Sequence, residues 1–279
     1  MNVGQVGVTS KTTIDGGRMK HIGSHRDLEN YRDLVLVLLQ KELKIRYTNK
    51  ILGYLWSIAN PLSSAFIYFV AFGLILETRE EDYALILISG LFPWQWLSNS
   101  VGSSANLFVS KSSLIKKVNF PRNIIPLCSI LNHMVHYLAS IPVLLVLLLI
   151  SHRYPTPSWI YGFPLLLVIQ FCTAYGIALA ISSVNLFFRD LERLVSILLH
   201  FLFFLTPILY TADRYPVEYR NLIIGLNPAA SLIVNWRSLF LNGSLELRPL
   251  LLSIGYATLS LVIGHLVYKK LSWKFAELI

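Results

Sequence analysis

Six stretches of this 279-residue chain contain no Asp, Glu, Lys or Arg. Each is long enough to cross a bilayer as a helix, which takes about 20 predominantly apolar residues. A helix also satisfies its own backbone donors and acceptors, as lipid requires. We therefore predict an all-α polytopic membrane protein with six transmembrane helices. The predicted spans are residues 54–76, 83–110, 123–151, 154–188, 194–212 and 249–268.

Composition supports a membrane setting over a soluble one. Only 14% of the residues are charged, whereas soluble domains have about 25%. The net charge of +9 could indicate nucleic-acid binding, but the basic residues lie between the apolar runs, so we expect no nucleic-acid partner. Cys128 and Cys172 lie inside apolar runs with no close cysteine–histidine pairing, so neither a disulfide framework nor a metal site is indicated.

The distribution of Lys and Arg predicts the orientation. If the N-terminus lies in the cytoplasm, cytoplasmic segments hold eighteen of the Lys and Arg residues and external segments hold six. This bias follows the positive-inside rule. We therefore expect a multi-pass protein of a bacterial cytoplasmic membrane with both termini in the cytoplasm. Residues 1–30 are predicted to be a mobile tail without a signal peptide, and residues 31–279 a single transmembrane domain.

The segment 221–236 is uncharged but too interrupted to be a seventh span, because Asn227 and Pro228 lie in its middle. A seventh span would also move Lys269 and Lys270 to the outside, against the charge bias. We predict two short re-entrant helices on the external side. Pro207 is expected to let the fifth span bend at a gate. The family resemblance given below implies that residues 213–245, which include Asn227 and Pro228, are external elements of this gate.

Residues 33–51 combine apolar positions with basic ones, a pattern typical of a helix lying in the inner membrane interface. Four basic residues in it could contact lipid head groups, namely Lys41, Lys44, Arg46 and Lys50. The alternative is a basic flank that only orients the first span.

The loop between the second and third spans resembles a short amphipathic helix. Its serines can cap a helix, Leu114 and Ile115 provide an apolar face beside Lys116 and Lys117, and Pro121 ends it. Such an edge could insert into a cleft of a partner protein. An ordinary positively charged loop is the alternative.

Four segments in register resemble one protein family, the permeases of ABC exporters for O-antigen, capsule and teichoic acid. The resemblance runs from about residue 31 to the C-terminus. The segments are "RYTNKILGYLWSIANPL" (46–62), "LIKKVNFPRNIIPL" (114–127), "NLFFRDLERLVSILLHFLFFLTPILY" (185–210) and "LNPAA" (226–230).

This resemblance implies a homodimer bound to two cytoplasmic ATP-binding-cassette subunits. Residues 111–120 would be the coupling helix that enters the ATPase cleft, and 33–51 the interface helix. Arg189 and Asp190 would form a second cytoplasmic contact, although a local ion pair explains them equally well. ATP and Mg²⁺ would bind the partner. This chain would hold no cofactor and catalyse no reaction itself.

A lipid-linked polysaccharide is longer than a bilayer is thick, so we expect a continuous passage whose wall has aromatic faces that stack on sugars. The alternative for each aromatic residue is packing or anchoring at the membrane interface. The candidates are Tyr54, Trp56, Phe66, Tyr68, Phe69, Phe72, Phe201, Phe204 and Tyr210.

Other function classes fit the sequence less well. A membrane-embedded glycosyltransferase would need acidic residues at the cytoplasmic face, but the only dense acidic cluster is the predicted external loop around Glu77 and Asp82. A secondary transporter would show internal repeats or ionisable residues within its spans. An ABC exporter of capsule, teichoic acid, a lipid or a drug is the nearest alternative to O-antigen export.

Overall fold

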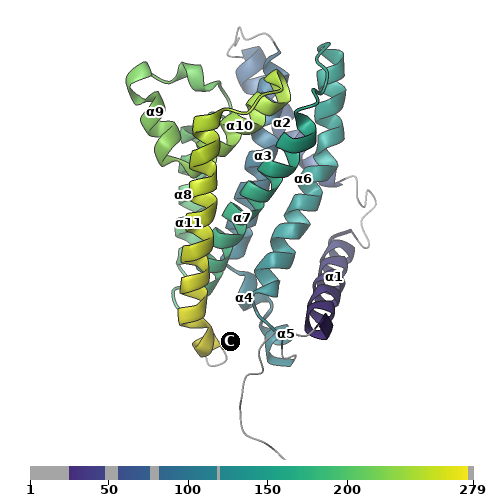
Figure 1. Ribbon diagram of the computed structural model, residues 1–279, viewed down its shortest axis with the longest axis vertical. Helices are drawn as coiled ribbons and strands as arrows, with labels where there is room; N and C mark the ends of the chain where they lie inside the picture. The colour runs from purple at the N-terminus through teal and green to yellow at the C-terminus, as the bar shows by residue number, and fades with distance from the viewer. Residues whose placement is uncertain (1–24, 48–55, 76–81, 118–119, 276–279) are drawn as a thin grey trace, which may run out of the picture.

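The computed structural model describes residues 25–47, 56–75, 82–117 and 120–275, and all regular structure in these ranges is helical, which confirms the predicted all-α class. Figure 1 shows the arrangement. The helices are α1 (His25–Tyr47), α2 (Trp56–Tyr68), the π-helix η2 (Phe69–Ile75), α3 (Tyr83–Ser104), α4 (Leu107–Ser110), α5 (Ser112–Lys117), α6 (Ile124–Ile150), α7 (Trp159–Asn185), α8 (Leu191–Leu205), η3 (Ala212–Arg214), α9 (Val217–Leu226), α10 (Pro228–Asn242), α11 (Leu247–Leu271) and η4 (Ser272–Lys274).

Three helical segments are long and apolar enough to cross a membrane: Ile124–Ile150, Trp159–Asn185 and Leu247–Lys274. They coincide with the predicted third, fourth and sixth spans. α2 continues directly into η2, and the apolar part of this pair, Ala59–Ile75, is shorter. The remaining three spans, and hence the count of six, stay predictions.

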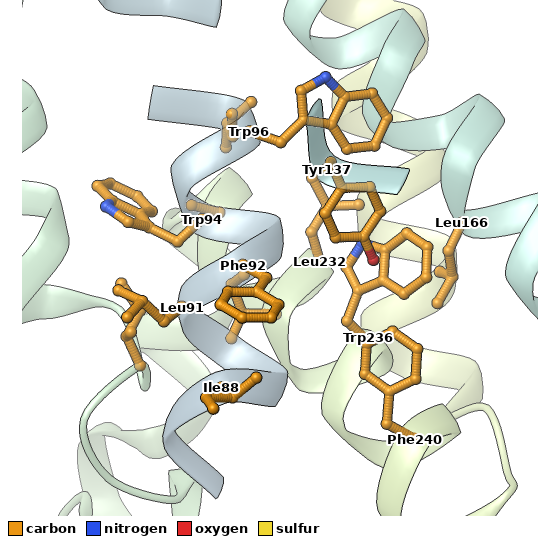
Figure 2. Packing of buried hydrophobic residues seen from close by; sticks show 14 of the residues in the cluster. Ile88, Leu91, Phe92, Trp94, Trp96, Tyr137, Leu166, Leu232, Trp236 and Phe240 are labelled. Carbon is orange, nitrogen blue, oxygen red and sulfur yellow. The ribbon is translucent and has the colours of Figure 1, made fainter. Parts of the chain in front are cut away.

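α3 is the central helix of the fold. Sixteen of its 22 residues are buried, and it contacts α2, α6, α7, α8 and α10. In Figure 2, Ile88, Phe92 and Trp96 of α3 lie opposite Tyr137 of α6 and Trp236 of α10. Because its neighbours are other helices, α3 can carry buried serines such as Ser89 and Ser100 that a lipid-facing helix would avoid.

α7 and α11 lie side by side and approach each other most closely at two glycines (Figure 1). A Cβ built on Gly176 would lie 2.2 Å from the backbone carbon of Ser260, and one built on Gly264 would lie 2.2 Å from the carbonyl oxygen of Gly176. Small residues at such positions let helix backbones pack directly in membrane proteins.

α8 ends earlier than predicted. The sequence predicts a span to residue 212 with a bend at Pro207, but the helix ends at Leu205 and Thr206 is extended (φ −98°, ψ 139°). The residue before a proline is disfavoured in the helical region, which explains the stop. The predicted break at Asn227 is confirmed, since α9 ends at Leu226 and α10 begins at Pro228. α10 is a buried helix, since every residue from Ala229 to Phe240 is buried.

The helical bundle has two ends (Figure 1). α4, α5 and the C-terminus lie at one, here called the α5 end, and α9 lies at the other, the α9 end. Tyr54, Lys50 and most of the predicted 1–30 tail lie outside the described residues, as does the side chain of Arg46.

Candidate functional site

A small apolar cluster holds the α5 end together. It consists of Leu107, Phe108, Ile115, Ile125, Leu186 and Phe275. The sequence predicts that Ile115 helps to form an apolar edge for a partner, but its side chain is only 9% exposed and packs inside this cluster. The surface that α5 offers outward therefore consists of half-buried Leu114 and exposed Lys116 and Lys117.

The C-terminal residues close this cluster. Phe275 is fully buried, and its ring lies 5.0 Å from that of Phe108 and 5.9 Å from that of Tyr268. Arg122 donates from Nη1 to the carbonyl oxygen of Ser272 at 3.1 Å and lies over the Phe275 ring. The segment predicted to couple to an ATPase is thus fixed by residues about 160 positions later in the chain.

α1 is tied to the same end. It packs against α6, and Glu42 of α1 forms an ion pair with Lys111 at 2.9 Å. Lys41 and Lys44, the predicted head-group contacts, are exposed on α1. The predicted interface helix and the predicted coupling helix are therefore in direct contact, through a pair that the sequence analysis did not single out.

Arg189 and Asp190 lie just beyond the end of α7 and are exposed. The chain passes from buried Leu186, a member of the cluster, to these two residues within four positions. The two predicted cytoplasmic contacts, α5 and this turn, are therefore anchored in the same apolar cluster, through Ile115 and Leu186.

Removing the Phe275 ring is expected to loosen this support. Phe275→Ala should lower the free energy of unfolding by about 3 kcal/mol, the low end of the range for a buried phenylalanine, and should shift the thermal transition of the purified protein downward. The matched control is Trp273→Ala, two residues earlier in η4, where the side chain is 66% exposed. Equal effects of the two substitutions would contradict the assigned role of Phe275.

The three predicted gate residues lie near one another at the ends of α8 and α10. Asn227 caps α10, since its Oδ1 accepts hydrogen bonds from the backbone amides of Ala229 and Ala230 at 3.0 and 3.3 Å. Its Nδ2 donates to Oγ1 of Thr206 at 2.9 Å. One side chain therefore links the start of α10 to the residue before Pro207, where α8 has just ended.

Two substitutions distinguish the capping of α10 by Asn227 from its hydrogen bond to Thr206. Asn227→Ala should cost about 1 kcal/mol for the lost cap and about 1 kcal/mol more for the lost bond to Thr206. Asn227→Ser keeps a capping oxygen on a shorter side chain, so it should lose only the second contribution. Thermal unfolding of the purified variants measures both, and a serine variant as unstable as the alanine variant would contradict the dual role.

Arg237 lies beside the predicted gate residues, and the sequence analysis did not single it out. Its guanidinium group is buried and donates to the carbonyl oxygens of Ile86, Ile208 and Tyr210 at 2.9 to 3.0 Å. It thereby connects α10 with α3 and with the irregular segment after α8. The sequence did contain one indication of its importance, because Arg237 is a single basic residue within an apolar run. In a membrane protein such a residue usually has a specific partner or function.

Arg237 is one of the residues that line a cavity of about 450 Å³ at the α9 end. Ion pairs on its wall join Arg153 to Asp82 and Arg220 to Asp213, both at 3.1 Å. Burial, with a smaller contribution from Asp213, raises the pKa of Glu246 on the same wall. The first ion pair joins the residue before α3 to the segment between α6 and α7, and the second joins α9 to η3.

The predicted channel aromatics divide into two groups. Trp56, Phe66, Phe201 and Phe204 are between 42% and 68% exposed. The others pack inward: Tyr68 lies 5.2 Å from Phe203, Phe69 lies 6.3 Å from Tyr83, Phe72 is half-buried, and the Tyr210 hydroxyl donates to the carbonyl oxygen of Phe204. Among the candidates that the structure describes, the exposed group has the larger accessible ring surface.

Residues 33–241 match the family model of ABC-2 type transporters. The chain belongs to this family. The matched region starts within α1 and ends within α10, so it contains both predicted cytoplasmic contacts and the gate. The resemblance seen in the sequence is confirmed at the level of the family.

This ABC-2 transporter is similar to proteins named as export permeases and to one named as a transport protein. It is 41% identical over 247 residues to the O-antigen export system permease protein RfbA of Klebsiella pneumoniae, covering 88% of this chain and 95% of the relative. A protein of the same name from Myxococcus xanthus is 31% identical, covering 90% and 97%. The polysialic acid transport protein KpsM of Escherichia coli is 23% identical, covering 84% and 92%.

Proposed function

We propose that this chain is the membrane permease subunit of an ABC exporter that moves a lipid-linked polysaccharide, O-antigen in the first place, across the bacterial cytoplasmic membrane. The observation that carries this proposal is the 41% identity to an O-antigen export permease over 88% of the chain. Capsule export is the second candidate, which the weaker similarity to a polysialic acid transport protein supports.

The active unit in this proposal is a homodimer with six spans per chain and two ATP-binding-cassette subunits on the cytoplasmic side. ATP and Mg²⁺ bind those subunits, and this chain catalyses no reaction. The α5 end faces the cytoplasm, as the positive-inside bias supports. Leu114, Lys116, Lys117, Arg189 and Asp190 contact the ATPase, while Ile115 holds α5 in place from within.

Substrate enters from the inner leaflet. Exposed Lys41 and Lys44 of α1 attract the anionic head group of the lipid carrier, and the ion pair between Glu42 and Lys111 links that helix to the coupling segment. The polymer then passes the exposed aromatic residues of α2 and α8 and leaves past the gate formed by α10.

A gene deletion in the organism that carries this chain tests the proposal. Surface polysaccharide should disappear while lipid-linked polymer accumulates inside the cytoplasmic membrane, and plasmid-borne wild-type chain should restore export. Normal amounts of long polymer on the surface of the deletion strain would overturn the proposal.

A further inference from the structure

A charged cavity and an apolar groove meet where α11 begins, at the α9 end. The cavity is the one of about 450 Å³ whose wall includes Arg237. The groove, of about 570 Å³, runs along the exposed face of α11. Arg248 and Leu252 line both spaces. α9 lies beside α11 here (Figure 1), since the Tyr256 hydroxyl donates to the carbonyl oxygen of Gly225. A ligand that fills both spaces needs a polar group joined to an apolar chain.

The described residues of the cavity wall carry one more positive charge than negative. Four of them are arginines and three are carboxylates. The two ion pairs on this wall neutralise two charges of each sign. Arg237, Arg248 and Glu246 remain, and none of them forms an ion pair within the described ranges. The cavity can therefore balance a ligand with a single negative charge.

Arg248 is the cation that a ligand can reach. Its side chain is exposed, and in the described part of the chain its one hydrogen-bond partner is Oδ1 of Asn221. A guanidinium group has five donors in a planar fork that matches the oxygens of a phosphate. Arg237 lies deeper and donates to backbone carbonyl oxygens, so it adds charge rather than contact. Basic pockets between membrane helices bind anionic lipid head groups.

The groove below Arg248 is apolar and about as long as one leaflet is thick. Gly255 forms an open notch between exposed Leu251 and Leu259, since nothing lies within 4 Å of a Cβ added there. From Leu247 to Leu259 the helix rises about 18 Å, close to half of the roughly 30 Å hydrocarbon core. The groove therefore has room for one acyl chain of one leaflet. Besides Arg248, it is lined by Leu247, Leu251, Leu252, Gly255, Tyr256 and Leu259.

These properties select an amphiphile whose head carries one negative charge. A phosphodiester has this charge, whereas a phosphomonoester or a pyrophosphate carries more. A free anion would leave the groove without an occupant, and a lipid without net charge would leave the excess cation unbalanced. We propose that an anionic phospholipid of the outer leaflet binds at the start of α11, with its phosphodiester on Arg248 and one acyl chain in the groove. Only the choice of leaflet rests on the proposed function, through the orientation of the chain.

Two variants test the two halves of this lipid site. Arg248→Met removes the head-group contact, and Gly255→Leu fills the groove from a position with open space. Arg214→Met is the matched control, because Arg214 is an exposed arginine at the same end that does not line the cavity. The full chain is purified in detergent, and thermal unfolding without lipid checks that each variant is folded. Native mass spectrometry then measures binding of dioleoyl phosphatidylglycerol, with one negative charge, and of dioleoyl phosphatidylcholine, with no net charge.

The wild-type chain should bind phosphatidylglycerol about tenfold more tightly than phosphatidylcholine, because loss of a charge-assisted contact has about this effect. Arg248→Met and Gly255→Leu should each weaken phosphatidylglycerol binding by a similar factor, and Arg214→Met should bind like wild type. Equal binding of the two lipids by wild type, or wild-type binding by Arg248→Met, would overturn the proposal. Tighter binding of a polyprenyl phosphate would overturn it too, since the occupant would then be a lipid carrier. Polymer export in cells is scored separately, so the proposed function can stand when the lipid site fails.

Discussion

Gly176→Ala is expected to prevent stable folding, although it adds only one methyl group. The new Cβ would lie 2.2 Å from a backbone carbon and 2.4 Å from the carbonyl oxygen of Ser260 on α11. Backbone atoms cannot rotate away as a side chain can, so the two helices must separate. The loss of stability should reach or exceed the about 1–3 kcal/mol typical of overpacking.

Gly255→Ala is the matched control, because it lies on α11 with nothing within 4 Å of an added Cβ. Alanine is favoured over glycine in a helix interior by about 1 kcal/mol, so this variant should be as stable as wild type or more stable. Size-exclusion chromatography in mild detergent, after heating in steps, measures both. A monodisperse Gly176→Ala protein with wild-type thermal stability would contradict the close α7–α11 contact.

Arg237→Met is expected to have the second largest effect. The substitution removes the guanidinium donor from the carbonyl oxygens of Ile208 and Tyr210, while that of Ile86 keeps the Ser89 hydroxyl as a donor. Each buried acceptor left unpaired costs about 1–3 kcal/mol, so a total on the order of 3 kcal/mol is expected. Arg237→Lys should not rescue stability, because one ammonium group lacks the planar fork that reaches several acceptors. Gly90 leaves the space through which this guanidinium passes, since a Cβ there would lie 2.7 Å from Nη2.

Arg248→Met provides the comparison at the same end of the molecule. Arg248 is exposed and donates to Oδ1 of Asn221, so its loss should change stability by no more than about 0.5 kcal/mol. Thermal unfolding of the purified variants and the amount of polymer on the cell surface are both measured. An Arg237→Met protein that matches Arg248→Met in both would show that the buried guanidinium does not hold the gate.

The sequence predicts the helical class and the positions of the main helices because a charge-free run in lipid has few alternatives to a helix. The break at Asn227 could also be predicted from the sequence, since an Asn-Pro pair combines a capping side chain with a residue that lacks an N–H. The end of α8 was harder to predict. Residues 206–212 are apolar enough to continue a span, but Pro207 and the hydrogen bond from Asn227 to Thr206 end the helix.

The functional residues were predictable only where they act through local pattern. The exposed positions on α5 and after α7 follow from charge and turn signals. The inward direction of Ile115 does not, because it depends on Phe275, 160 residues away. The position of Arg237 likewise depends on contacts with α3 and with the segment after α8, and no periodicity in the sequence encodes them.

A reconstituted complex can show whether this chain forms the ATP-driven export path for a lipid-linked polysaccharide. The purified chain is placed in liposomes with its ATPase partner, radiolabelled lipid-linked polymer is added outside, and polymer that becomes protected inside is followed. Protection is expected only when the ATPase faces outward and ATP is hydrolysed, and none with a non-hydrolysable ATP analogue. Active ATP hydrolysis by a correctly assembled complex without any protected polymer would contradict it.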